Sequence, residues 1–310
     1  MPAPIRPPMR AVAFGEVLAV LAQEQPGALE DAEMFRRSLG GAEANVAIAL
    51  AARGIDVAML TRVGDDGFGR FATGLLSRLG VDVAPVQIDP ARPTGLYVKE
   101  IDGGGSSMHY YRSGSAAAAI GPEYLDLPAV AGAVAGAGLV HTTGITPAIS
   151  DTAAAAQRAL VQAFAGRGLC SFDLNWRPAL WRGREAAGSE LLAGFMRSSD
   201  IAFAGQDEAA VVFGVHTADG LRRMFPEPRW LVVKNDGGAA AAFDGDERVD
   251  VAPGRVDVVE AIGAGDAFAA GFLAGVMYGF SLRDCVVQGH DMAALALRTA
   301  GDHIGAGGVG

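Results

Sequence analysis

The chain has 310 residues, of which 50% are hydrophobic and 19% are charged, and its formal net charge is −10. This length and apolar content suffice for one large domain or two ordinary ones with a sizeable core. The acidic balance argues against a nucleic-acid partner, because phosphate backbones require clustered lysines and arginines. A few local arginines could still attract a small anionic substrate into one cleft.

Three sequence features indicate the cellular compartment: the cysteines, the N-terminus and the apolar stretches. Cys170 and Cys285 lie far apart, so we expect free buried thiols in a reducing environment rather than a metal site or a disulfide framework. Residues 1–8 are proline-rich and lack an apolar core, which predicts a disordered or leader extension and not a signal peptide. The Ala/Gly-rich stretches are shorter than the ~20 residues of a membrane span. The sequence therefore predicts a cytoplasmic protein with no membrane partner.

Segments with the pattern of strands alternate with segments with the pattern of helices along most of the chain. Short apolar runs predict strands at 10–14, 57–63, 138–142, 169–173, 201–204 and 230–234. Apolar residues at helical spacing, several closed by glycine, predict helices at 42–53, 69–79, 152–165, 267–278 and 286–299. This alternation implies an α/β fold with a parallel sheet covered by helices on both faces.

One segment in the middle departs from that rhythm. Residues 95–100 and 107–112 alternate apolar and polar side chains around Asp102-Gly103-Gly104-Gly105, which predicts a β-hairpin. A hairpin fits poorly inside a parallel sheet, so we expect it to belong to a small β-structured lid.

The sharpest chemical feature is Gly263-Ala264-Gly265-Asp266, directly ahead of an apolar helix. Glycines allow a tight turn, and backbone N–H groups at a helix start can bind an anion. An aspartate there could accept the proton of an attacking hydroxyl, while the amides of residues 264–266 stabilise a transferred phosphoryl group. On spacing alone, an ordinary loop with Asp266 as N-cap is the simpler interpretation.

Two sequence blocks, the second of which consists of two segments, favour the catalytic interpretation instead. Residues 263–268 (GAGDAF), together with 40–47 (GGAEANVA) and 64–69 (GDDGFG), resemble the signatures of ribokinase-like (phosphofructokinase-B type) carbohydrate kinases. The resemblance implies one kinase domain over residues 9–310, a three-layer α/β/α sandwich with a small β-sheet lid. The lid strands would come from about residues 16–38 and 94–113. ATP and Mg²⁺ as cofactors, and a homo-oligomer formed through the lid, are also implied.

Further segments resemble 2-keto-3-deoxygluconate kinases within that family. They are 93–97 (PTGLY), 110–116 (YYRSGSA), 144–148 (GITPA), 173–177 (DLNWR) and 301–303 (GDH). The resemblance implies an ATP-dependent sugar-acid kinase that phosphorylates the terminal hydroxyl of 2-keto-3-deoxygluconate. Asp266 would then be the catalytic base, and the amides of residues 264–266 would form the anion hole. Gly263, Ala264 and Gly265 would be the other catalytic residues.

A sugar-acid substrate carries a carboxylate that needs cations or several donors. Arg112 on the hairpin and Arg177 past a strand end are candidates, because guanidinium matches a carboxylate geometrically. The other implied substrate-binding residues are Gly41, Asn45, Tyr97, Tyr110, Asp266 and Asp302. Each tyrosine could instead be an ordinary strand aromatic, Arg112 a solvated edge-strand charge, and Gly41 with Asn45 a plain turn and helix start.

The nucleotide side follows the family pattern less closely. Its implied residues are Asn175, Lys234, Asn235, Asp236, Gly237, Gly238, Gly263, Ala264 and Gly265. Gly205 replaces the Asn of an Asn-x-x-Glu motif, the glycines after Lys234 are shifted, and Ala261 replaces a threonine. Glu208 is retained from that motif and would hold Mg²⁺ through water. These departures fall on residues that the resemblance implies for metal and phosphate contacts.

Alternatives remain open at this point. The same fold could act on a neutral sugar such as fructose or ribose, or on a galactonate-derived rather than a gluconate-derived acid. A non-catalytic nucleotide- or sugar-sensing protein is another class, suggested by Gly205 and the altered loop at 234–239. A hydride-transfer enzyme is disfavoured, because no Gly-x-Gly-x-x-Gly follows the first strand.

Overall fold

The main sheet of the computed structural model has eight strands in the order β14-β13-β12-β11-β10-β9-β1-β4. The structure describes residues 10–102 and 105–298. Six strands are parallel: β1 (Arg10–Phe14), β4 (Val57–Leu60), β9 (Ala137–Thr143), β10 (Leu169–Asp173), β11 (Ile201–Gly205) and β12 (Trp230–Lys234). Antiparallel pairing then adds β13 (Ala240–Asp244) and β14 (Glu247–Val251) at one edge.

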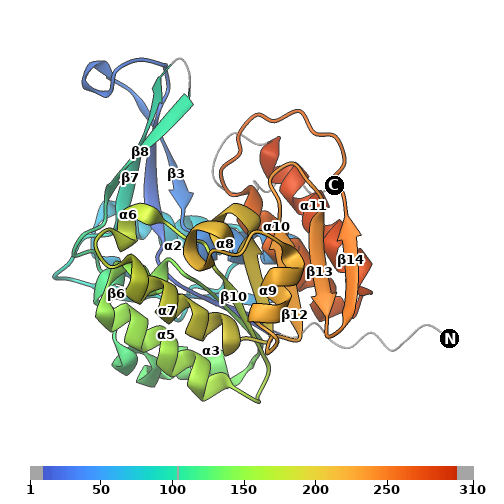
Figure 1. Cartoon of the computed structure of the whole chain (residues 1–310). Helices are drawn as coiled ribbons and strands as arrows, with labels where there is room; N and C mark the ends of the chain where they lie inside the picture. The colour runs from blue at the N-terminus through green and yellow to red at the C-terminus, as the bar shows by residue number, and fades with distance from the viewer. Residues whose placement is uncertain (1–9, 103–104, 299–310) are drawn as a thin grey trace.

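Helices cover both faces of this sheet, as Figure 1 shows. One face carries α1 (Ala42–Ala52), α2 (Gly67–Arg78), α10 (Ala264–Tyr278) and α11 (Leu282–Leu297). The other carries α3 (Pro128–Ala135), α5 (Asp151–Phe164), α7 (Glu185–Arg197), α8 (Gln206–Phe213) and α9 (Ala218–Met224). Strand β1 divides accordingly: Ala11 and Ala13 join one buried cluster and Val12 and Phe14 the other. The expected three-layer α/β/α sandwich is confirmed.

A four-stranded small sheet stands apart from the main sheet (Figure 1). Its order is β3 (Phe35–Gly40), β2 (Leu18–Gln23), β7 (Leu96–Asp102) and β8 (Gly105–Tyr111). Strands β7 and β8 form the predicted antiparallel hairpin, whose turn residues 103–104 lie outside the described chain. Leu18, Val20 and Tyr97 form the buried apolar patch of the small sheet.

Short elements complete the chain. A two-stranded sheet pairs β5 (Arg62–Gly64) with β6 (Gln87–Asp89). Single helical turns are η1 (Leu29–Asp31), η2 (Ala117–Ala119), η3 (Pro122–Asp126), α4 (Thr146–Ile149) and α6 (Pro178–Trp181). Within the described ranges no helix combines the length and apolarity needed to cross a bilayer. Both cysteines are buried free thiols, as expected.

Several predicted boundaries are wrong, and helix α11, for example, begins at Leu282 rather than at 286. The strand predicted at 57–63 is broken, because β4 ends at Leu60 and β5 pairs elsewhere. The break falls at Thr61, whose carbonyl accepts hydrogen bonds from the Gln87 N–H (3.0 Å) and the Tyr124 hydroxyl (3.2 Å), outside the main sheet. Helix α10 begins at Ala264 rather than at 267, so Asp266 lies inside its first turn.

Candidate active site

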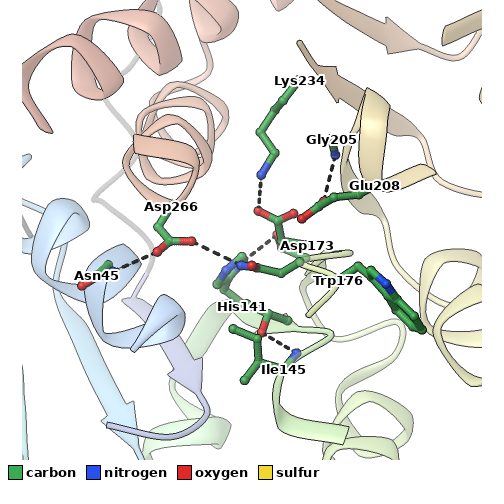
Figure 2. A network of polar contacts seen from close by, with 12 residues as sticks. Asn45, His141, Ile145, Asp173, Trp176, Gly205, Glu208, Lys234 and Asp266 are labelled. Atoms are coloured by element: carbon green, nitrogen blue, oxygen red, sulfur yellow. Dashed lines mark hydrogen bonds and ion pairs between the residues drawn. The ribbon is translucent and has the colours of Figure 1, made fainter. Parts of the chain in front are cut away.

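Polar side chains gather where the parallel strands end. The chain proceeds from β1 to β4 on one side and only later to β9 on the other, so the strand order reverses beside β1. In open α/β sheets, ligands bind outside the carboxyl ends of the strands at such a switch point. Asp266 of α10 and Asn45 of α1 point toward each other here (Figure 2).

Asp266 occupies the centre of this cluster. Its side-chain oxygens accept hydrogen bonds from Nδ2 of Asn45 (2.8 Å) and from Nδ2 of Asn175 (3.3 Å), and the residue is only 9% exposed. Burial raises the pKa of Asp266 and the charge of Asp173 adds to the rise, whereas the Asn45 hydrogen bond opposes it. The carboxylate is therefore more basic than an exposed aspartate, which suits a general base.

The turn ahead of Asp266 presents backbone N–H groups. Gly263 caps α10 with φ 78°, a left-handed conformation that favours glycine. The amides of the first helical turn lack intrahelical acceptors, and only a long bond (3.4 Å) joins the Ala264 N–H to Ala261 O. An added Cβ on Gly265 would lie 3.5 Å from Nζ of Lys234, so an ammonium adjoins this turn. We call this turn the candidate anion site, because amides and an ammonium together favour the binding of an anion.

Lys234 ends β12 and reaches the cluster from the opposite side. Its Nζ lies 2.6 Å from Oδ2 of Asp173, which is 1% exposed. Burial alone would lower the pKa of Lys234, but the charges of Asp173 and Glu208 outweigh it and the pKa is raised. Oδ1 of Asp173 has no hydrogen-bond partner among the described residues. Lys234 therefore stays a cation beside the anion site.

Asn175 follows β10 in an unusual backbone conformation. Its φ is 42°, and no other non-glycine residue in the described chain has a positive φ. Asparagine tolerates this region better than most residues. Such strain clusters at functional sites, where surrounding contacts hold it in place. The conformation lets the Asn175 amide reach Asp266.

Glu208 and Arg177 form the outer edge of the cluster. Oε2 of Glu208 accepts from the Gly205 N–H (3.2 Å), and Oε1 lies 3.5 Å from Nη1 of Arg177. Burial raises the pKa of Glu208 above its ordinary value, although Lys234 opposes the rise. Arg177 keeps 46% of its side chain exposed. The absent Asn is thus replaced by a glycine whose N–H holds Glu208.

Arg112 lies at the base of the small sheet, just past β8. It forms an ion pair with Glu16, whose carboxylate also accepts from the Ser115 hydroxyl. The Arg112 side chain is 9% exposed, so its interpretation as a solvated edge-strand charge is wrong. Gly41 adjoins the same place with φ 120°, and an added Cβ would overlap the carbonyl oxygen of Glu16. Only glycine fits there.

A second buried acid lies beneath the cluster. Glu43 of α1 is 1% exposed, and its Oε1 accepts from the hydroxyls of Thr143 (2.7 Å) and Thr146 (3.0 Å). Its Oε2 has no hydrogen-bond partner in the described chain and packs against Gly15. Burial raises the pKa of Glu43 from 4.5 to about 7, although the two hydroxyl hydrogen bonds oppose the rise.

Comparison with known proteins now decides the family. The model of the pfkB family of carbohydrate kinases matches residues 9–306. The chain belongs to the pfkB family of carbohydrate kinases. It is 34% identical to a 2-dehydro-3-deoxygluconokinase of Thermoproteus tenax over 297 residues, which cover 94% of this chain and 89% of the relative. The expectation of an ATP-dependent carbohydrate kinase is thereby confirmed.

Solved structures agree with this assignment. A PfkB protein from Polaromonas sp. JS666 superposes with a TM-score of 0.87 at 31% identity, covering 94% of this kinase and 96% of that chain. A sugar kinase from Pyrococcus horikoshii, solved in complex with ATP, has a TM-score of 0.83 at 25% identity and covers 94% and 93%. The expected ribokinase-like fold is that of these neighbours.

The structure gathers most of the residues that the sequence singled out in this kinase. Asn45, Lys234 and Asp266 lie within one cluster (Figure 2). Asn175 joins the cluster through the hydrogen bond that its amide donates to Asp266. The loop that directly follows Lys234 turns through a hydrogen bond from the Gly238 N–H to Asn235 O (2.9 Å), with Asp236 and Gly237 between them. Asp302 lies outside the described residues.

The two tyrosines are placed differently from each other. Tyr97 is 3% exposed and belongs to the apolar patch of the small sheet, with its ring centroid 5.2 Å from that of Tyr110. Tyr110 is 48% exposed. Their roles as hydroxyl donors to the sugar stay predictions.

Sequence reasoning missed four buried polar residues around the site. They are Glu16, Glu43, His141 and Asp173. Nδ1 of His141 forms a hydrogen bond with Oγ of Ser171 (3.0 Å). Burial lowers the pKa of His141 to about 4, so its ring is neutral. A signal existed for Asp173, because a lone acid ends a predicted apolar strand at the functional edge of the sheet.

Proposed function

We propose that this kinase transfers the γ-phosphoryl group of ATP to the terminal hydroxyl of 2-keto-3-deoxygluconate, also called 2-dehydro-3-deoxygluconate. The observation that carries the proposal is Arg112, a buried guanidinium at the base of the small sheet. Its Nε has no hydrogen-bond partner among the described residues, so it retains a donor for an anionic group. Similarity to a 2-dehydro-3-deoxygluconokinase over 94% of the chain supports the same acceptor.

The phosphoryl-transfer step uses the central cluster. Asp266 accepts the proton of the attacking hydroxyl as its oxygen bonds to the γ-phosphorus and the bond to the β,γ-bridging oxygen breaks. Asn45 and Asn175 hold the carboxylate for this task. The first-turn amides of α10 and the ammonium of Lys234 balance the charge on the transferred group.

The described residues fit magnesium only as a water-held ion. They contain no group of three or more His, Cys, Asp or Glu residues that could hold a metal. Mg²⁺ usually keeps several waters and binds through one or two carboxylates plus substrate phosphates. Glu208 would hold it in that way, and the ion would neutralise the phosphate oxygens. The residues therefore fit Mg²⁺ as a partner of ATP.

The small sheet would close over the sugar and exclude water that could otherwise hydrolyse ATP. Its edge strands expose Phe35 (37%) and Tyr111 (61%), and Met34, directly ahead of β3, is 66% exposed. Exposed apolar patches mark interaction sites, which supports a homo-oligomer formed through the small sheet. A cytoplasmic location stays a prediction.

A neutral sugar is the second candidate, and one observation favours it. The pairing with Glu16 compensates the charge of Arg112, so this part of the site carries no net charge. A neutral acceptor such as fructose would meet no unbalanced cation there.

A substrate panel with coupled ADP detection tests both candidates. We expect 2-keto-3-deoxygluconate, or its galactonate-derived epimer, to give a kcat/KM far above those for fructose and ribose. Higher kcat/KM with fructose would establish the neutral-sugar kinase instead. If no compound gives sugar-dependent ADP formation, the result would favour the non-catalytic sensor.

Asp266→Asn tests the base. We expect kcat to fall about 10²–10⁴-fold, the usual contribution of general base catalysis, with ATP affinity nearly unchanged. A variant with near-full turnover would refute the assignment of Asp266.

A further inference from the structure

An ion pair outside the mechanism joins the small sheet to the loop ahead of the anion site. Nζ of Lys99 contacts the carboxylate of Glu260, 161 residues away in sequence. The two side chains are only 9% and 15% exposed. A pair buried this deeply is held in a fixed geometry, because either charge alone would be strongly unfavourable there.

Lysine is rare in this chain. Of its 25 basic residues only two, Lys99 and Lys234, are lysines, and all the others are arginines. Both lysines are largely buried, and both form ion pairs with carboxylates. Lysine differs from arginine in carrying a compact point charge on a flexible stem. One ammonium thus contacts Glu260, just ahead of the turn at Gly263, and the other lies beside Gly265, just after it.

Lys99 lies on the face of the small sheet that contacts the loop ahead of α10. Residues two apart on a strand point to the same side, so Lys99 shares its face with Tyr97. Strand register places Lys99 opposite Ala22 of β2 and Met108 of β8, within the sheet rather than at an edge. A movement of the small sheet therefore carries Lys99 with it.

Glu260 lies three residues before Gly263, the N-cap of α10. Residues 252–263 form neither helix nor strand, and Val258 and Val259 are 61% and 65% exposed. The N–H groups of Val259 and Glu260 donate to Leu297 O at 2.7 and 3.2 Å. A segment with few buried apolar contacts takes its position from such discrete tethers. The Lys99 ion pair is the tether that comes from the small sheet.

We propose that Lys99 is a positioning residue for phosphoryl transfer, which sets the amides of residues 263–266 through Glu260 according to the position of the small sheet. The inference rests on the proposed function, in which the sugar binds under the small sheet and the triphosphate at these amides. Because each ligand favours the same arrangement, each raises the affinity for the other by the same factor.

Calorimetric titration of a non-hydrolysable ATP analogue, with and without saturating 2-keto-3-deoxygluconate, measures that factor. In the wild type we expect the sugar acid to tighten analogue binding about 5-fold or more. Lys99→Met keeps an unbranched side chain only one atom shorter and removes its charge, and should bring the factor to about 1. Glu260→Gln removes the other charge of the ion pair and should also bring the factor to about 1. The double variant Lys99→Glu with Glu260→Lys should regain at least part of the factor.

Glu100→Gln is the matched control. Glu100 neighbours Lys99 on β7 but points to the other face, where it contacts His109 (2.6 Å) and the Leu29 N–H (3.0 Å). The control should keep the wild-type factor. Circular dichroism and thermal unfolding show which variants are folded before they are compared.

Several results would overturn the proposal. They are a wild-type factor of 1, an unchanged factor in folded Lys99→Met, or an equal loss of analogue affinity with and without sugar acid, which marks a merely structural role. Failure of the proposed substrate is distinguishable, because the ADP panel on wild type would then select another sugar. The titrations are repeated with that sugar.

Discussion

Glu43 gives a stability prediction whose sign and size follow from its surroundings. The carboxyl is buried beneath the site, and its pKa is raised from 4.5 to about 7, mainly by burial. Glu43→Gln keeps an acceptor oxygen for the hydroxyls of Thr143 and Thr146 and removes the ionisation. The variant should therefore differ from wild type only where Glu43 would be charged.

The direction of the effect depends on which state binds the proton more tightly. A raised pKa means that the folded protein holds the proton more tightly than the unfolded chain, so stability is present below pH 4.5 and is lost as pH rises to about 7. One pKa unit corresponds to about 1.36 kcal/mol, so the rise of the Glu43 pKa from 4.5 to about 7 costs about 3 kcal/mol of stability above neutral pH. Glu43→Gln has no carboxyl group to ionise, so it does not lose this stability.

Urea unfolding of both proteins at several pH values measures the difference. We expect the free energy of unfolding of Glu43→Gln to exceed that of wild type by about 3 kcal/mol at pH 8, with the gap shrinking toward zero near pH 4.5. Glu190→Gln, on the exposed face of α7, is the matched control and should show no such trend. A difference of the same size at every pH would refute the reasoning, because it would reflect packing and not ionisation.

Three further predictions concern the site. Arg112→Ala should raise the KM for the sugar acid about 10- to 100-fold, the cost of a lost charged hydrogen bond, and change the KM for ATP little; equal rises would contradict its role. Wild-type kcat/KM should fall with decreasing pH through a pKa above the usual aspartate range, because burial raises the pKa of Asp266; a profile flat down to about pH 4 would refute the base. The ring NMR signals of His141 should not titrate between about pH 5 and 8, since burial lowers its pKa to about 4. Titration near 6.5 would contradict that burial.

The parallel core of the fold could be predicted because its strands are short continuous apolar runs. β1, β10 and β12 have the expected bounds, as strands buried on both faces should. The strand predicted at 57–63 failed, because the break after Leu60 depends on contacts with distant residues. The antiparallel β13 and β14 were not anticipated, since alanine-rich Ala240–Asp244 has weak strand propensity.

The candidate site could likewise be predicted only where its residues lie in short sequence motifs. Asn45, Asn175 and Asp266 lie in short motifs, so the sequence alone could indicate them. The Arg112–Glu16 and Lys99–Glu260 pairs join residues about 100 or more positions apart, and such pairings arise only from the tertiary fold. The scarcity of lysine was nevertheless visible in the sequence, and it would have directed attention to Lys99.

The left-handed backbone of Asn175 restricts which substitutions this position can accept. Glycine would adopt a φ of 42° without strain but would remove the amide that reaches Asp266. Aspartate also tolerates the conformation, yet it would add a carboxylate to a cluster that already holds Asp173 and Asp266. Any larger or branched side chain would carry the full steric cost. Asparagine alone therefore satisfies both the backbone conformation and the hydrogen bond at this position. Libraries that diversify this kinase should keep residue 175 unchanged.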